Sequence, residues 1–223
     1  MNLQFKQLVE INAEMFEGMD NLEILWLYRN KLTSVPLNTF MKLTKLEKLS
    51  LSGNQIEELP NGLFKNNFNL ETIYLHSNKL KFIGSTLFDG LTKLKEIDLS
   101  INQIEELPNG LFKNNVNLET IHLYSNKLKF IGSNLFNGLT KMNLVNLNNN
   151  VCINKRYTGS TAIIELKEDI KAQCFNPNEI VKPRSNFLIN IEKVSNFLDQ
   201  IMIGLMEADK RLKTKATKEL IAN

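Results

Sequence analysis

The chain has 223 residues, of which 43% are hydrophobic and 23% are charged, a balance that is ordinary for a domain with its own buried core. Its formal net charge of +3 is too small to argue for a nucleic-acid partner. No apolar run approaches the length of a membrane span, so we expect neither nucleic-acid binding nor a membrane-spanning segment.

The first residues predict one truncated unit of a repeat that continues through the chain. Leu8, Ile11 and Phe16 take positions that recur in every later unit, and the chain begins inside this unit. The N-terminus holds no apolar stretch suited to a signal peptide. Because repeat arrays normally need a polar terminal cap, we expect this chain to be a fragment of a longer, capped precursor.

Residues 22–141 contain five full copies of a 24-residue repeat. The copies begin LEILWLYRNKL, LEKLSLSGNQI, LETIYLHSNKL, LKEIDLSINQI and LETIHLYSNKL. Each fits L-x-x-L-x-L-x-x-N-x-L, with Ile in place of Leu at some positions. One unit cannot bury its own apolar edge, so neighbouring units must stack. Their short strands then form a parallel sheet that lines a concave face.

Two columns of identical residues run through the repeats. In the first column a buried asparagine can bond backbone groups that the bend after each strand would leave unpaired. In the second column phenylalanine side chains should stack as a spine beneath the convex side. The asparagine column is Asn30, Asn54, Asn78, Asn102, Asn126 and Asn150. The phenylalanine column is Phe16, Phe40, Phe64, Phe88, Phe112 and Phe136.

The stretch NQIEELPNGLFKNN occurs twice, beginning at Asn54 and again at Asn102, which indicates duplication of a two-repeat unit. Residues 46–93 and 94–141 differ at only ten of 48 positions, and seven of the ten lie in the strand segments. The seven pairs are Glu47/Lys95, Lys48/Glu96, Leu49/Ile97, Ser50/Asp98, Gly53/Ile101, Tyr74/His122 and His76/Tyr124. The core and the convex loops are therefore repeated, whereas the expected concave face has changed its chemistry.

Aromatic residues collect on that expected concave face. Aromatic rings with a polar atom suit recognition, although aromatic residues also favour strands for structural reasons. We favour recognition, and the nearby charges of both signs argue against a phosphate-backbone partner. The candidate ligand-binding residues are Trp26, Tyr28, Tyr74, His76, Asp98, His122 and Tyr124.

The solenoid is expected to end at residue 150 with a degenerate strand, and residues 151–174 predict a C-terminal cap. TAIIELKEDIKAQC reads as a short helix with Thr161 as a possible N-cap. Ile163, Leu166, Ile170 and Cys174 share one apolar face at helical spacing, and this face can lie over the open end of the solenoid. Cys152 and Cys174 could be two free buried thiols or a disulfide. We favour the disulfide, because an N-x-C sequence at the end of a repeat array fits an oxidising compartment. No C-x-x-C motif accompanies the two histidines, so we expect no metal site.

Residues 3–174 resemble the extracellular class of leucine-rich repeats found in Toll-like receptor ectodomains, Slit-type proteins and secreted insect immune proteins. The five quoted copies and the ending NNNVC…C carry this likeness. The resemblance implies an α/β solenoid, or horseshoe, that binds other molecules and catalyses nothing. It also implies a secreted or extracellular location, with the signal peptide and the N-terminal cap absent from this chain. Caps of this class commonly use four cysteines, whereas this chain has two.

The remaining residues predict a linker followed by a helix. Residues 175–184 contain Pro177 and Pro183, which oppose helix formation. Residues 185–223 predict an amphipathic helix, because apolar residues recur at alternating steps of four and three. Two interpretations stay open: a helix docked on its own protein, or a short coiled coil that joins chains into a homo- or hetero-oligomer.

The sequence features above bear on three classes of function. The leading hypothesis is a recognition protein that binds a protein or a microbial glycan on its concave face, in innate immunity or at the cell surface. The alternative is an assembly protein in which the C-terminal helix oligomerises the chain and the repeats act as a scaffold. The third is an enzyme. The sequence holds no Gly-rich phosphate loop, nucleophile elbow or metal-ligand cluster, so we expect neither catalysis nor a cofactor.

Overall fold

A computed structural model of the chain describes residues 1–159 and 162–174. The chain divides into two compact units, Met1–Phe175 and Asn176–Asn223, and the described residues all belong to the first. The predicted linker at 175–184, the predicted amphipathic helix at 185–223 and the proposed N-cap Thr161 lie outside the described residues.

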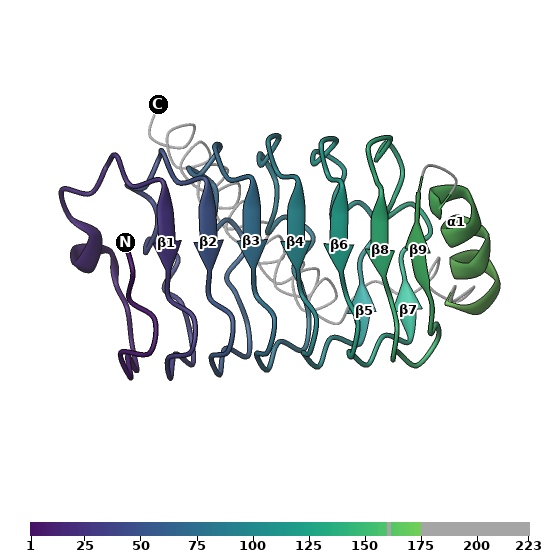
Figure 1. Cartoon of the computed structure of the whole chain (residues 1–223), viewed down its shortest axis with the longest axis horizontal. Coiled ribbons are helices and arrows are strands. Elements are labelled where there is room, and N and C mark those ends of the chain that lie inside the picture. Colours follow the sequence, from purple (N-terminus) through teal and green to yellow (C-terminus); the bar gives the residue numbers. More distant parts are fainter. Residues whose placement is uncertain (160–161, 175–223) are drawn as a thin grey trace, which may run out of the picture. The chain divides into compact units, whose positions relative to one another are not determined.

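The first unit is a parallel-sheet solenoid, as predicted (Figure 1). Its main sheet has the strand order β1-β2-β3-β4-β6-β8-β9, in which all neighbours are parallel except β8 and β9. The strands of this sheet are β1 (Ile24–Trp26), β2 (Lys48–Ser50), β3 (Thr72–Tyr74), β4 (Glu96–Asp98), β6 (Thr120–His122), β8 (Leu144–Asn146) and β9 (Arg156–Thr158). Strands β5 (Glu106–Leu107) and β7 (Phe130–Ile131) form a second, two-stranded parallel sheet.

Residues 1–5 run alongside β1 and continue the ladder of the sheet. The backbone N–H of Leu3 donates to the carbonyl of Trp26 at 2.8 Å, and the N–H of Trp26 donates to the carbonyl of Met1 at 3.0 Å. A short 3-10 helix, η1 (Ala13–Phe16), follows, and the side chain of Asn12 caps it. Phe5 therefore occupies the same repeat position as Arg29, which is 24 residues further on.

The asparagine column acts as predicted. The Asn102 amide nitrogen donates to the carbonyls of Leu75 and Leu99, each at 3.1 Å, and its oxygen accepts the backbone N–H of Leu80 at 3.0 Å. The other members repeat these bonds 24 residues apart, so each asparagine joins consecutive turns of the solenoid. The phenylalanine column is also confirmed, with Phe40, Phe64, Phe88 and Phe112 stacked at ring-centroid distances of 5.8–6.3 Å.

A second asparagine column, which we had not predicted, lies in alternate repeats. The amides of Asn67 and Asn115 are fully buried and donate to two backbone carbonyls each. Leucine takes the same position in the intervening repeats, as at Leu91. Because leucine occupies the same position in the intervening repeats, we expect these asparagines to contribute less to stability than those of the first column.

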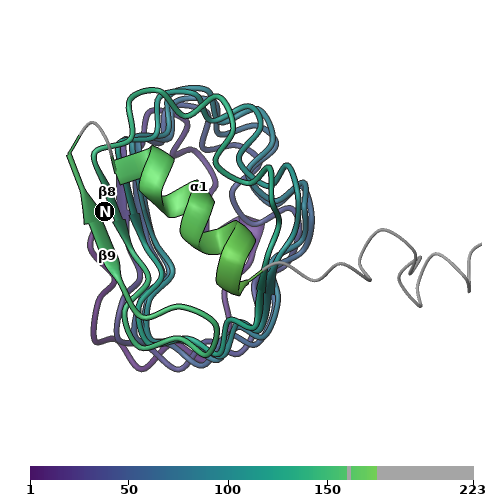
Figure 2. The same cartoon turned by 90° about the vertical axis from the view of Figure 1, so that its right-hand side faces the viewer.

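The solenoid ends in a cap formed by β9 and α1 (Ala162–Gln173). Figure 2 shows α1 lying across the end of the stacked turns. Leu166, Ile170 and Cys174 of the predicted apolar face are buried there. Cys174 forms a disulfide with Cys152, with the two Cα atoms 5.1 Å apart, so the predicted disulfide is confirmed.

A polar network fixes α1 to β9. The Tyr157 hydroxyl donates to Asp169 at 2.6 Å, and the Lys155 ammonium donates to the same carboxyl oxygen at 2.9 Å. The hydrogen bond from Tyr157, followed by that from Lys155, holds the pKa of Asp169 below its usual value. Burial, with the hydrogen bond to Asp169, raises the pKa of the Tyr157 hydroxyl, which therefore stays protonated as a donor.

We expect Asp169→Asn to destabilise the cap near neutral pH and to have little effect in acid. A depressed folded-state pKa stabilises the fold above the unfolded-state value of 3.8, and this stabilisation is lost as the pH falls through the lower folded-state value. Because the side chain is partly exposed, the difference near pH 7 should be about 1 kcal/mol. Thermal unfolding of both proteins at neutral and acid pH measures it, and an equal difference at both pH values would contradict the assignment.

Candidate functional site

The outward face of the main sheet, which we call the sheet face, carries the predicted candidate residues. The strands bring Trp26, Ser50, Tyr74, Asp98 and His122 into register, in that order across the sheet. Large aromatic residues therefore alternate with small or acidic ones from strand to strand. Aromatic ridges stand on β1, β3 and β6, and two valleys lie between them.

The first valley, formed by Ser50, Ser52 and Gly53, is the floor of an open hollow. The hollow has a volume of about 980 Å³. Its walls are the aromatic ridges of β1 and β3, so it exists because short side chains lie between long ones. The lining residues are Asn2, Gln4, Phe5, Trp26, Tyr28, Arg29, Ser50, Ser52, Gly53, Tyr74, His76 and Ser77.

The second valley carries larger side chains at the matching positions. Asp98 stands where the first valley has Ser50, and Ile101, which is 46% exposed, stands where it has Gly53. Asp98 is held in place because the backbone N–H and the hydroxyl of Ser100 both donate to its Oδ1. Two of the differences between the duplicated halves thus alter the floor of the valley directly.

The structure brings four of the predicted residues together and places the others apart from them. Trp26, Tyr28, Tyr74 and His76 line the hollow. His122 and Tyr124 form a separate edge-to-face pair, with ring centroids 6.3 Å apart, on the third ridge. Asp98 lies between the two groups, in register with both β3 and β6.

Sequence reasoning missed the N-terminal wall of the hollow. The ring of Phe5 packs edge-to-face against Tyr28 at 5.7 Å, and the Arg29 guanidinium lies 5.3 Å from the centre of the Phe5 ring. Asn2 and Gln4 line the same wall. Extending the 24-residue register back from Arg29 to Phe5 would have revealed this wall, because residues 1–5 take the strand positions of a repeat.

The charges of the sheet face differ between its two ends. Arg29 lies on the wall formed by β1, whereas Glu96 and Asp98 belong to β4, beyond Tyr74. Burial raises the pKa of the Tyr74 hydroxyl, and the carboxylates of Glu96 and Asp98 raise it further, so Tyr74 offers a protonated hydroxyl. The Nδ1 atom of His122 is buried without a hydrogen-bond partner.

Two polar side chains of the sheet face are hydrogen-bonded to neighbouring serines. The Oδ1 atom of Asp98 accepts hydrogen bonds from Ser100, and the Nδ1 atom of His76 lies 3.2 Å from the hydroxyl of its neighbour Ser77. The described part of the chain holds no cluster of three or more His, Cys, Asp or Glu side chains placed to bind a metal ion.

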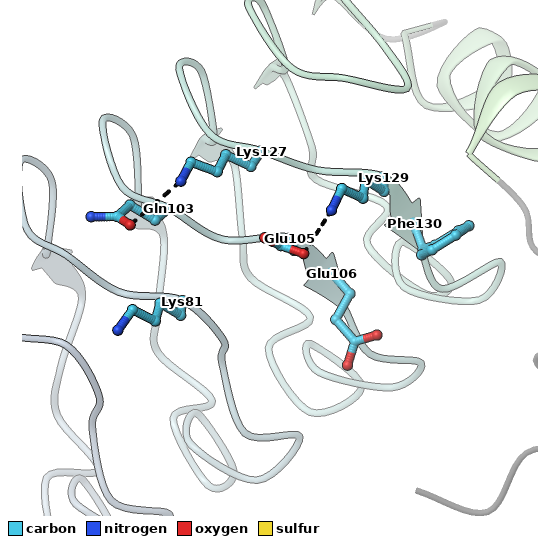
Figure 3. A pocket seen from close by; sticks show the side chains of 7 residues that line it. All are labelled: Lys81, Gln103, Glu105, Glu106, Lys127, Lys129 and Phe130. Carbon is cyan, nitrogen blue, oxygen red and sulfur yellow. Dashed lines mark hydrogen bonds and ion pairs between the residues drawn. The ribbon is translucent and has the colours of Figure 1, made fainter.

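A second hollow, of about 550 Å³, lies on the flank beside β5 and β7 (Figure 3). Its lining residues are Lys81, Gln103, Glu105, Glu106, Lys127, Lys129 and Phe130. Lys129 pairs with Glu105 at 2.9 Å, and Lys81 pairs with Glu57 at 2.8 Å. Lys81 and Lys129 thus each reach the acid 24 residues before them, and Lys127 reaches the amide of Gln103 at 3.5 Å. These lysines therefore link consecutive turns of the solenoid.

A family model described as leucine rich repeat matches residues 1–56, 45–104 and 92–151. The chain therefore belongs to the leucine-rich repeat family. None of the helices among the described residues is long and apolar enough to cross a membrane. A search of curated proteins found no match.

Solved structures share the fold. The leucine-rich repeat domain of APL1B is 20% identical with a TM-score of 0.56, over 68% of this chain and 44% of that chain. A leucine-rich repeat domain of APL1 is 21% identical with a TM-score of 0.61, over 65% and 38%. The Toll–Spatzle complex, described as a molecular hub in Drosophila development and innate immunity, gives 25% identity and a TM-score of 0.54, over 65% and 22%. The chain thus spans less than half the length of each of these proteins.

Proposed function

We propose that this leucine-rich repeat domain is a non-catalytic recognition module that binds a protein ligand in the hollow of the sheet face. The observation that carries the proposal is the hollow itself, with small side chains as its floor and aromatic walls on both sides. Its lining combines Tyr, Ser, Gly and Asn with Trp and Arg, which is the composition of protein-binding paratopes. None of the lining residues is aliphatic.

An extracellular setting follows from the same proposal. The Cys152–Cys174 disulfide fits an oxidising compartment, where such bonds persist. The Toll structure, which shares this fold, was determined in complex with Spatzle, and it is described in terms of development and innate immunity. A role in immune or cell-surface recognition is therefore part of the proposal. A microbial glycan as ligand is the alternative that the experiment below must exclude.

Filling the first valley should abolish binding without unfolding the domain. The variant Ser50→Asp/Gly53→Ile copies the residues that the chain already carries at 98 and 101, so the sheet can accommodate them. Arg29 must shift slightly, because a Cβ on Gly53 would lie 3.2 Å from its Cγ. We expect at least a ten-fold loss of affinity, the scale of one lost interface hot spot. The melting temperature should fall modestly, because isoleucine at the positive φ of Gly53, 62°, adds backbone strain.

The chain contains a built-in reporter for this measurement. Trp26, the single tryptophan of the sequence, lines the hollow, so its fluorescence and its quenching by acrylamide report directly on occupancy. Purified secreted proteins and a panel of microbial glycans would be titrated into the full chain. Phe82→Ala, an exposed change outside the lining of the hollow, is the matched control. A ligand that binds the filled-valley variant with unchanged affinity would refute the proposed site.

A further inference from the structure

Arg29 is the one lining residue of the hollow with a permanent charge. Within the described part of the chain, none of the ion pairs includes Arg29, although five lysines are paired with acids of the preceding repeat and Lys155 is paired with acids of α1. Its guanidinium lies instead against the ring of Phe5, at 5.3 Å from the centroid. An arginine in this setting keeps its planar set of donors available to a partner.

The surrounding residues hold Arg29 at the wall. Arg29 and Phe5 occupy equivalent positions just after the strand of their repeats, which we call the strand-exit column. The backbone φ is positive at both, 54° at Arg29 and 55° at Phe5. The next member of the column is Gly53, and a side chain there would press on the stem of Arg29. In the duplicated half the same position holds Ile101, whose preceding neighbour in the column is the short Ser77. The glycine therefore leaves room for the arginine.

We propose that the protein ligand presents a carboxylate to Arg29, so that the hollow is specific for a protruding acidic segment. This inference rests on the proposed function and deepens it by naming the chemistry of the partner. A guanidinium binds a carboxylate through two parallel N–H···O bonds, which fixes orientation as well as affinity. The carboxylate binds on the β1 side of the hollow, next to Arg29. On the β3 side it would lie near Glu96 and Asp98 of β4, which are next to Tyr74, and their negative charges would repel it.

The aromatic walls complete the specificity. Trp26, Tyr28 and Tyr74 are the residue types that, with arginine, dominate binding energy at protein interfaces. The floor of serine and glycine lets the tip of a loop approach the sheet closely. A partner loop with an acidic residue beside an apolar or aromatic one matches both parts of the hollow. The carboxylate can come from an Asp or Glu side chain or from a free C-terminus, which shares the same chemistry.

The test is a selection of displayed peptides against the full chain. Two phage libraries of random peptides are used, one with the peptides constrained as loops and one with free C-termini. Binders are collected on the wild type and rejected if they also bind Gly53→Ile, which fills the valley without adding a charge. We expect Asp or Glu to be enriched at one position of the loops, or a free C-terminus to be required, and the two libraries distinguish these sources.

Arginine variants then connect the selected acid to Arg29. Arg29→Gln should weaken the selected peptides at least ten-fold, and Arg29→Lys should restore only part of the affinity, because lysine lacks the planar fork. Lys48→Gln removes a positive charge from β2 outside the lining of the hollow, and it should leave affinity nearly unchanged. Replacing the acid of the peptide by its amide, Asn for Asp or Gln for Glu, should weaken binding to the wild type. The same replacement should not weaken binding to Arg29→Gln any further.

The outcomes separate this inference from the proposed function. Binders that need the open hollow but show no acidic preference, or that bind Arg29→Gln unchanged, overturn the acidic partner and leave the recognition site standing. If every peptide that binds the wild type also binds the filled-valley variant Gly53→Ile with the same affinity, both the acidic partner and the recognition site in the hollow are wrong. If no peptides are selected while an oligosaccharide of uronic acids quenches Trp26 in an Arg29-dependent way, the partner is an acidic glycan and the protein-partner inference is wrong.

Discussion

Replacing Phe88 with alanine should lower the free energy of unfolding by about 3–5 kcal/mol, the range found when a buried phenylalanine leaves a cavity. Phe88 is fully buried and stacks between two neighbours of the spine, at 6.3 Å from Phe64 and 5.8 Å from Phe112. Its removal therefore interrupts the spine in the middle of the array. The neighbouring rings cannot close the gap, because each is fixed to its own turn of the solenoid.

Denaturation in urea, followed by circular dichroism, measures this effect. Phe82→Ala is the matched control, because Phe82 belongs to the same repeat but is 50% exposed. Its substitution should change stability by no more than about 0.5 kcal/mol. Similar losses for the two variants would show that the spine does not carry the stability assigned to it.

Asn102→Leu should cost about 3 kcal/mol or more, even though leucine has nearly the same size. The substitution leaves the backbone N–H of Leu80 buried without a partner and removes donors from the carbonyls of Leu75 and Leu99. One orphaned buried group costs about 1–3 kcal/mol. Four backbone groups lose a bond here, because Asn102 also donates to the carbonyl of Ser100 at 3.1 Å. Neighbouring asparagines still serve two of them, since Asn78 donates to Leu75 and Asn126 to Leu99.

The same change at Asn115 is the internal comparison and should be much milder. Asn115 donates to the carbonyls of Phe88 and Leu91, but each of these carbonyls already accepts a backbone N–H. The side-chain oxygen of Asn115 is buried without a partner, so leucine also removes one unsatisfied atom. Denaturant midpoints of the two variants decide the matter. An Asn115→Leu loss equal to that of Asn102→Leu would contradict this difference between the two columns.

The repeat made most of the fold predictable. A residue that recurs every 24 positions must occupy equivalent places in stacked turns, so the burial of Asn102 and Phe88 followed from the sequence. The cap was predictable for a similar reason, because the helical spacing of Leu166, Ile170 and Cys174 defined a face that could cover the open end. Asn67 and Asn115 escaped prediction because they recur only in every second repeat, where leucine interrupts the column.

The candidate site was predictable only in part. Periodicity identified the outward positions of Trp26 and Tyr74, but the hollow depends on the difference in side-chain volume between neighbouring strands. That difference appears only when Ser50 and Gly53 are set in register between the aromatic residues. Phe5 and Arg29 were missed because the wall that they form includes the incomplete first repeat, whose strand segment lacks the full motif.

The alternation of ridges and valleys also makes the sheet sensitive to whether repeats are gained singly or in pairs. Copying two repeats preserves the alternation and adds a new valley about 10 Å away, two strand spacings along the solenoid. Copying a single aromatic repeat beside itself would set two aromatic ridges on adjacent strands, about 4.8 Å apart, with no floor between them. Insertion of an even number of repeats thus adds further valleys of the same kind. The floor of each valley can then change independently, as the difference between Ser50 and Asp98 shows. An odd insertion would keep the packing but interrupt the alternation at the point of insertion.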